Sequence, residues 1–408
     1  MKIRSITIFT DPEWPIKEDV VEKAGEFTAD ARSALESIGY EVQTTRMATI
    51  PFPRLFTGWD AEEVLALAVE IDEAVKSHGI DYISLGPALP DVPESYAIIP
   101  QLLSSTDNVF LSGVIASPED GISLSAIRAC GQIICEASKI KANGFGNLYF
   151  GALASVPPGA PFFPAAYHRG GTPTFAIATE AADLAVTALN AADDLLEARH
   201  TLVRIIEQNA VSIENTCRDL AFQFGVAFSG IDFTLAPFPE ESRSIGAALE
   251  RLGAHTVGQH GSLAATAFLA DTVDRAHFTR VGFSGLFFPL LEDETLAKRA
   301  GEGMLSVTDL MLYSTVCGTG LDTVPLPGDT TADEIAALLL DIAALSQRLR
   351  KPLTARLLPI PGKKEGDLTD FDFSYFSNSR VLGLRSAPLT GLFTGSEAFD
   401  LGQHQHDL

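Results

Sequence analysis

Hydrophobic and polar positions along the chain alternate between two periods, one typical of strands and one typical of helices. Short runs rich in β-branched and aromatic residues are each followed by a longer stretch with helical spacing. Repeated alternation of this kind predicts an α/β fold with a largely parallel sheet and helices packed outside it. The predicted strands are Arg4–Phe9, Tyr40–Ala48, Asp81–Gly86, Val109–Ile115, Leu148–Val156, Val226–Leu235, Val281–Leu290 and Leu353–Leu358.

The segments between these strands have helical patterns. From Glu180 to Phe224 the chain contains neither glycine nor proline, and its apolar spacing fits one long helix or two stacked helices. The clearest helix follows Thr331, because Thr331 and Glu334 have the spacing of a capping box. The other predicted helices are Ile16–Ile38, Ala61–Ser77, Glu94–Ser104, Leu124–Ala142, Ser244–Leu252, Ser262–Asp274, Glu294–Ala300 and Ser306–Tyr313.

No shift in composition and no internal repeat divides the chain, so we expect residues 1–408 to form a single α/β domain. The net charge of −24 argues against nucleic acid and anionic membrane surfaces as partners. The apolar runs are too short to cross a membrane, and the N-terminus lacks a signal-peptide pattern. Four cysteines form no paired framework. We therefore expect a soluble cytoplasmic protein, whose apolar helix surfaces are compatible with a homodimer.

The segment Cys317–Asp329 is the first candidate for chemistry. It combines a Gly-x-Gly turn with two stiffening prolines, which would hold side chains in a fixed geometry. Cys317 is a candidate nucleophile or redox group if the pKa of its thiol is lowered, and otherwise a buried structural thiol. Asp329 lies beside a helix start and is expected to cap it. Asp322 has no such role and is the stronger catalytic candidate.

The second candidate segment is Pro361–Tyr375, which follows a predicted strand. Lys363 and Lys364 could anchor a phosphate or a carboxylate, and Tyr375 could contact the same ligand. Three nearby aspartates could bind Mg²⁺ or Ca²⁺, which prefer oxygen ligands. The alternative is a surface turn in which aspartate side chains cap their own backbone. The three aspartates are Asp367, Asp370 and Asp372.

Two further segments contain isolated polar side chains. The proline- and aromatic-rich run Val156–His168 cannot form a helix or strand interior and is predicted to be a rigid loop at the wall of a pocket. His168 is a candidate general base there, although a buried histidine can also serve only as a hydrogen-bond partner. Asp232 lies on an apolar strand, so it needs a cation, hydrogen-bond donors or a metal.

Several of these segments together resemble an uncharacterised family, domain of unknown function 711. The resemblance lies in Pro161–His168, Gly230–Pro239, Cys317–Asp329 and Lys351–Asn378. It implies a closed, roughly ten-stranded α/β barrel similar to pyruvate formate-lyase and related glycyl radical enzymes, with helices outside and a central finger loop. It also implies association with small ACT-domain proteins, which sense amino acids, and it implies no known substrate.

The residues give little support for radical chemistry. Glycyl radical enzymes have an Arg-Val-x-Gly-aromatic motif near the C-terminus, and Arg380–Gly383 matches only its first part. Leu384 replaces the aromatic residue, and this chain is far shorter than those enzymes. We therefore expect no glycyl radical chemistry and interpret Arg380–Leu384 as the last strand of the barrel.

Two functional hypotheses follow. The first is a non-radical enzyme that acts on a small anionic or amino-acid-like metabolite by hydrolysis, isomerisation or lyase chemistry. Arg356, Lys363 and Lys364 would anchor the anion, Asp322, Asp367 and Asp372 would bind a divalent metal or transfer protons, and Cys317 and His168 would be nucleophile and base.

The second hypothesis is a metabolite-binding regulator that works with an ACT-domain partner. It predicts an enclosed anion pocket without a nucleophile–base pair. Both hypotheses require the loops near residues 168, 232, 322 and 367 to meet around one cavity.

Overall fold

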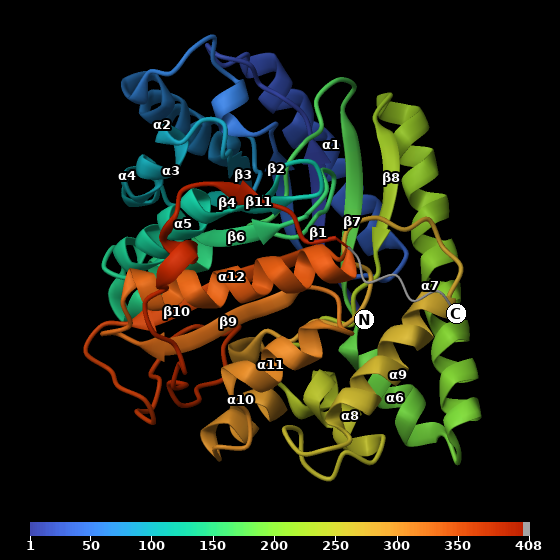
Figure 1. Cartoon of the computed structure of the whole chain (residues 1–408). Helices are drawn as coiled ribbons and strands as arrows, with labels where there is room; N and C mark the ends of the chain where they lie inside the picture. The colour runs from blue at the N-terminus through green and yellow to red at the C-terminus, as the bar shows by residue number, and fades with distance from the viewer. Residues whose placement is uncertain (403–408) are drawn as a thin grey trace.

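The computed structural model describes residues 1–402, whose eleven strands belong to one sheet (Figure 1). Nine strands are paired in the order β8-β7-β1-β2-β3-β4-β6-β10-β9, and β5 and β11 form a small extension beside β4. The α/β class is therefore confirmed. The strands are β1 Lys2–Phe9, β2 Val42–Ala48, β3 Tyr82–Ala88, β4 Val109–Ser117, β5 Gly121–Ser123, β6 Phe150–Ala154, β7 Thr174–Glu180, β8 Ala227–Asp232, β9 Gly320–Pro327, β10 Leu353–Ile360 and β11 Ala398–Phe399.

The main strands form two parallel sets that run in opposite directions. In the first set β1, β2, β3, β4 and β6 are parallel, and in the second set β7 is parallel to β8 and β9 to β10. The sets meet antiparallel at β1–β7 and at β10–β6. The carboxyl ends of the first set therefore lie beside the amino ends of the second.

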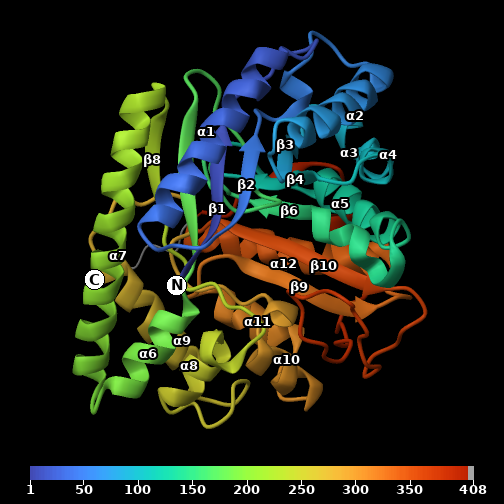
Figure 2. The same ribbon diagram turned by 180° about the vertical axis from the view of Figure 1, so that it is seen from behind.

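Helices pack against one face of this sheet, as the two opposite views show (Figures 1 and 2). None of the helices within residues 1–402 has the length and apolar content needed to cross a membrane. The predicted run 180–224 forms two helices. The helix predicted within 94–105 is also divided into two short helices, and Pro100 lies in the first turn of the second one. The helices are α1 Glu18–Ser37, α2 Ala61–Ser77, α3 Glu94–Ala97, α4 Ile99–Ser105, α5 Leu124–Ala137, α6 Ala182–Ala191, α7 Leu195–Phe224, α8 Ile245–Arg251, α9 Ser262–Arg275, α10 Glu294–Gly301, α11 Val307–Ser314 and α12 Ala332–Leu349.

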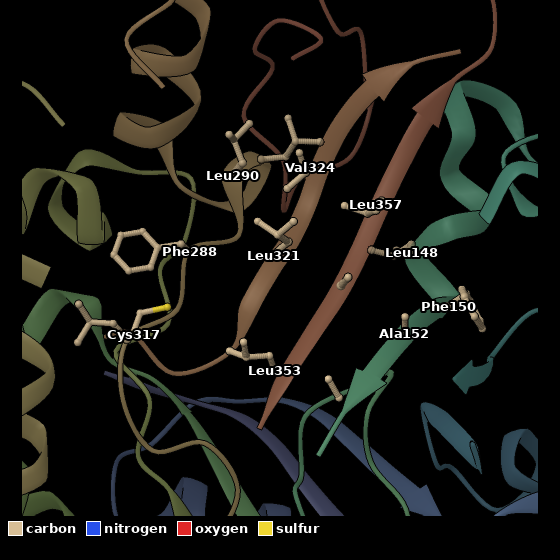
Figure 3. Packing of buried hydrophobic residues seen from close by; sticks show 14 of the residues in the cluster. Leu148, Phe150, Ala152, Phe288, Leu290, Cys317, Leu321, Val324, Leu353 and Leu357 are labelled. Carbon is tan, nitrogen blue, oxygen red and sulfur yellow. The ribbon is translucent and has the colours of Figure 1, made fainter. Parts of the chain in front are cut away.

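The local signals in the sequence explain several of these boundaries. The predicted capping box is present at the start of α12, where the Thr331 hydroxyl accepts from the Glu334 N–H and the Glu334 carboxylate accepts from the Thr331 N–H. The apolar stripe of α12 is buried, and side chains from β9 and β10 such as Leu321 and Leu357 join the same hydrophobic core (Figure 3). Burial of this apolar surface is the main stabilising contribution on the helix-covered face.

Regular strand pairing does not continue between the two edge strands β8 and β9. The predicted strand Val281–Leu290 is not a regular strand. This part of the chain forms isolated bridges, from Arg280 to Ile231 on β8, from Leu286 to Leu235, and from Pro289 to Asp322 on β9. One reason is that the Asp232 side chain accepts hydrogen bonds from the N–H groups of Phe283 and Ser284, which would otherwise be available to a strand partner. The closed barrel therefore stays a prediction.

Three other sequence expectations were wrong. Strand β7 was not predicted. Strand β9 was not predicted either, because its prolines indicated a loop. Its ladder partner lies only on the β10 side, so Pro325 can be accommodated. Asp322 consequently lies within a strand, not in a loop. The predicted last strand, Arg380–Leu384, has only a single bridge, between Arg380 and Leu368.

The contact between Asp232 and the 280–290 segment provides a test of this arrangement. A Cβ atom at Gly282 would overlap the Asp232 carboxylate, and Gly282 has a φ of 66°. Gly225, at the end of α7, has a φ of 68° and open space around it. We expect Gly225→Ala to lower the free energy of unfolding by about 1–2 kcal/mol through φ strain alone, and Gly282→Ala by a further 1–3 kcal/mol through steric overlap.

Urea unfolding of both variants measures this difference. Equal losses for the two alanine variants would contradict the packing of Asp232 against Gly282.

Candidate functional site: a charged cavity on the inner face of the sheet

The face of the sheet opposite the helices is covered by the proline-rich segment 156–168. This segment is buried and hydrogen-bonds to strands that are distant in sequence: Ser5 Oγ on β1 donates to the Pro161 carbonyl, and Ser84 Oγ on β3 donates to the Ala166 carbonyl. The rigid loop predicted from the sequence is thus confirmed as a segment without helix or strand. Its aromatic side chains Phe162 and Phe163 form part of a layer that lies over several charged residues.

Four charged side chains beneath this segment form one buried ion network. The Arg356 guanidinium on β10 binds both oxygens of Asp322 on β9, with 2.7 Å from Nη2 to Oδ2. The same guanidinium lies 3.1 Å from Oε1 of Glu292, whose Oε2 accepts from Arg4 on β1 at 2.5 Å. Burial raises the pKa of Asp322, and the charge of Arg356 opposes this shift. Because every charge here has an opposite partner, the network can exist in an interior of low polarity.

A second buried ion pair lies at the end of β7. The Glu180 carboxylate binds Arg243 through Oε1 and accepts a hydrogen bond from Gln43 through Oε2 at 2.6 Å. Phe238 contacts Arg243 in a cation–π arrangement at 4.1 Å, and the ring of Tyr375 packs against Phe238 at 5.7 Å. Tyr375, predicted to bind substrate, therefore lies at the rim beside this pair.

Asp232 is satisfied by hydrogen-bond donors, one of the three possibilities that its sequence context left open. Its carboxylate accepts from Thr234 Oγ1 at 2.5 Å, Ser284 N at 2.8 Å and Phe283 N at 3.0 Å. Burial raises the pKa of Asp232 above its ordinary value. The side chain is therefore fully engaged in holding the segment 280–290 against β8.

Arg46 on β2 differs from the other arginines on this face. Within residues 1–402 it forms no ion pair with a carboxylate; Nε donates to Thr44 Oγ1 at 2.9 Å, and the guanidinium lies 4.9 Å from the centre of the Phe163 ring. Burial, followed by repulsion from the nearby Arg4, lowers the pKa of Arg46 to about 9. A lowered pKa means that the positive charge is destabilised where it stands, so an anion at Arg46 would be stabilising.

A cavity of about 20 Å³ lies between Arg46 and the ion network. This volume holds about one water-sized group. Asp232 also lines it, and so does Thr319, whose hydroxyl is 1 % exposed and has no hydrogen-bond partner in the described part of the chain. Its other lining residues are Arg4, Pro161, Phe162, Ala178, Thr179, Thr234, Ala236, Phe283 and Phe287. An arginine without an ion pair and a hydroxyl without a hydrogen-bond partner therefore line the same small space.

His168, the predicted general base, lies at the carboxyl end of β1, outside this cavity. Its Nδ1 is 2.9 Å from Oδ2 of Asp11, while Oδ1 of Asp11 accepts from Ile50 N at 2.7 Å. A carboxylate that fixes a histidine ring in this way selects its tautomer, as in general-base pairs and in purely structural ones. Asp11, but not His168, borders a larger surface groove of about 780 Å³ beside α1.

Cys317 lies in a different environment from the one expected of a nucleophile. It is buried among hydrophobic side chains and lies beside Phe288 (Figure 3). Burial raises the pKa of its thiol, which is the opposite of the shift that would activate it. Neither the cavity lining nor the described hydrogen bonds bring Cys317 together with His168.

Local contacts engage Lys363, Asp367 and Asp370 of the segment 361–372. Lys363 Nζ lies 3.1 Å from Asp370 and donates to the Leu368 carbonyl, and Asp367 accepts from the backbone N–H of Lys364 at 2.7 Å. Within residues 1–402, no group of three or more potential metal-ligating side chains is present. The predicted metal ligands Asp367, Asp370 and Asp372 are therefore not gathered into one set.

Of the four positions expected to meet, only Asp232 and Asp322 lie close to the same arginine, Arg4. Sequence reasoning identified Arg356 and Asp322 but missed their partners Arg4 and Glu292, and it missed Arg46 and Thr319. Arg4 and Arg46 could have been identified by the rule applied to Asp232, because each is a charged residue inside a predicted strand. Glu292 and Thr319 follow irregular segments and offered no comparable signal.

Comparisons with known proteins identify relatives along most of the chain. Residues 1–378 match the family model described as Uncharacterised ACR (DUF711). A UPF0210 protein of Pyrobaculum arsenaticum is 32 % identical over 367 residues, covering 85 % of this chain and 79 % of the relative. A UPF0210 protein of Acetivibrio thermocellus is 31 % identical over 359 residues, covering 82 % and 78 %. These names state no activity, and the likeness to pyruvate formate-lyase stays a prediction.

The ion network yields a stability prediction. Arg356→Met leaves Asp322 without a cation and Glu292 with one fewer, so we expect the free energy of unfolding to fall by about 3–5 kcal/mol. Arg299 is a matched control, because it binds both oxygens of Glu250 at 2.7 and 2.8 Å but both side chains are about one-fifth exposed. Arg299→Met should lower the free energy of unfolding by only about 1 kcal/mol.

Chemical denaturation followed by circular dichroism compares the two variants. Similar losses for Arg356→Met and Arg299→Met would mean that the inner pair is solvated, not buried.

Proposed function

The chain belongs to the uncharacterised DUF711 family, and from the geometry of its inner face we propose that it binds a small anionic metabolite at Arg46. The observation that supports this proposal is the guanidinium of Arg46, which faces a cavity without any carboxylate partner among residues 1–402. An unpaired charge in such a place is costly unless a ligand compensates it. Arginine suits this task because its planar N–H groups match the oxygens of carboxylates and phosphates.

The other arginines of this face are each paired with a carboxylate. Arg4 and Arg356 are compensated by Glu292 and Asp322, and Arg243 by Glu180. Arg46 has no ion-pair partner within residues 1–402. Asp232, the carboxylate in the same cavity lining, is held by hydrogen-bond donors, which leaves the Arg46 guanidinium free to bind an anion.

The cavity supports binding more directly than catalysis. Its lining contains no cysteine and no histidine, and its carboxylate, Asp232, is held by the Thr234 hydroxyl and two backbone N–H groups. An anion pocket without a nucleophile–base pair is the arrangement expected of a metabolite-binding regulator. The ACT-domain partner implied by the sequence resemblance is then a natural recipient of the signal, and this partnership is part of the proposal.

Binding at Arg46 is tested by thermal unfolding in acetate, sulfate and phosphate, each compared with chloride at equal ionic strength. A bound anion raises the melting temperature, with about 2.7 kcal/mol of stabilisation at one hundred times its Kd. We expect Arg46→Gln to abolish this effect, and Arg46→Lys to keep part of it because the charge is retained. Without anions, Arg46→Gln should be at least as stable as the wild type, since it removes an unpaired charge.

Arg204, an exposed arginine on α7, provides the control. Arg204→Gln should respond to anions as the wild type does. Equal anion responses in Arg46→Gln and Arg204→Gln would refute binding at Arg46.

Catalysis on the metabolite is the second candidate, and the observation in its favour is the Asp11–His168 pair. We expect an enzyme to change the ¹H NMR spectrum of at least one component of a mixture of small organic acids. His168→Gln should remove that turnover, whereas His200→Gln, at an exposed position on α7, should not. An unchanged spectrum with the wild type, after anion binding has been detected, would favour the regulator.

Two structural predictions accompany the proposal. We infer that the segment Arg280–Leu290 closes the sheet into a ten-stranded barrel, because it bridges to both β8 and β9. The homodimer also stays a prediction; α7 carries exposed apolar side chains, among them Leu196 and Phe222.

A further inference from the structure

We infer that the ligand is a small organic acid with one carboxylate and no ammonium group, held by Arg46 and Thr319 and packed against phenylalanine rings. This inference rests on the proposed function, since it describes what occupies the same cavity. It excludes the amino-acid-like ligands that the sequence alone had left open.

The first argument is the supply of donors. In the cavity wall, the Thr319 hydroxyl has no hydrogen-bond partner within the described chain, and the Arg46 guanidinium uses only Nε, which donates to Thr44. The Thr319 hydroxyl is almost fully buried, and leaving such a hydroxyl unpaired costs roughly 1–3 kcal/mol. A carboxylate can accept from a guanidinium and a hydroxyl at once, so one headgroup would satisfy both.

The second argument is the lack of free acceptors for an ammonium group. Asp232 already accepts three hydrogen bonds, and both oxygens of Asp322 are bound to Arg356. Glu292 is shared by two arginines. An ammonium group entering here would find no unengaged carboxylate and would be repelled by Arg4 and Arg46. An α-amino acid would therefore lose more by desolvation of its ammonium than its carboxylate gains.

The third argument is charge and shape. Arg46 is the arginine of the cavity lining without an ion pair among residues 1–402, so a monoanion suits it better than a phosphate dianion, whose second charge would have no cation of its own. The remaining walls are apolar: Phe162, Phe283 and Phe287 are in edge-to-face contact, with ring centres 5.0 and 5.6 Å apart. The cavity holds little more than one small group, so a short hydrocarbon tail would have to displace the partly exposed ring of Phe283.

The experiment compares three molecules of nearly equal size on the full-length protein: propionate, L-alanine and propylamine. Isothermal titration and thermal unfolding at constant ionic strength give their relative affinities, with inorganic phosphate as a fourth probe. We expect propionate to bind at least ten times more tightly than L-alanine and more tightly than phosphate, and propylamine not to bind. L-alanine or phosphate binding as tightly as propionate would overturn this inference while leaving anion binding at Arg46 intact.

Thr319→Val provides the second arm, and Thr308→Val on α11, at an exposed site, is its control. We expect Thr319→Val to weaken propionate about tenfold without lowering the melting temperature of the free protein, and Thr308→Val to change neither. Unchanged propionate affinity in Thr319→Val would remove Thr319 from the site. If no anion shifts the wild-type melting temperature at all, the proposed function itself fails.

Discussion

The buried ion network of Arg4, Glu292, Arg356 and Asp322 is the constraint on which the inner face depends. Glu292, Asp322 and Arg356 are buried, and the Arg4 side chain is 18 % exposed, so each buried member must have an opposite charge within hydrogen-bond reach. The pairs join residues that are far apart in sequence, 288 positions in the case of Arg4 and Glu292. The network thereby ties β1 to β9 and β10, and the two halves of the chain must assemble together for the charge of Arg4 to be matched.

This constraint also explains why a functional site can be recognised without a known substrate. Among the arginines of this face, Arg46 alone forms no ion pair within residues 1–402 and lines a cavity, whereas a fully exposed arginine would carry no such meaning. The same reasoning lowers the weight of Lys363, which is paired with Asp370, and of Lys364, which is exposed to solvent. Solvent exposure, more than residue type, distinguishes the charged residues of the candidate site from the charged residues of the surrounding surface.

The sequence predicted the elements whose signals are local. Alternating periodicity indicated the α/β class, and the Thr331–Glu334 pair marked the start of α12. Strand β9 was missed because Pro325 and Pro327 are strand breakers in general, and an edge position that tolerates them is a tertiary property. The site was predicted only in part for the same reason. Asp322 and Arg356 were recognised singly, but their mutual contact, and the isolation of Arg46, depend on which strands become neighbours.

The opposite directions of the two strand sets determine which loops lie at each rim of the sheet. In an all-parallel sheet the ligand loops follow the carboxyl ends at one rim only. Here each rim collects the carboxyl ends of one set, so Asp11 and His168 lie at one and Phe238 and Tyr375 at the other. The two rims therefore differ chemically, and a ligand that entered at one rim, as proposed, would leave the other rim free for contact with a second protein.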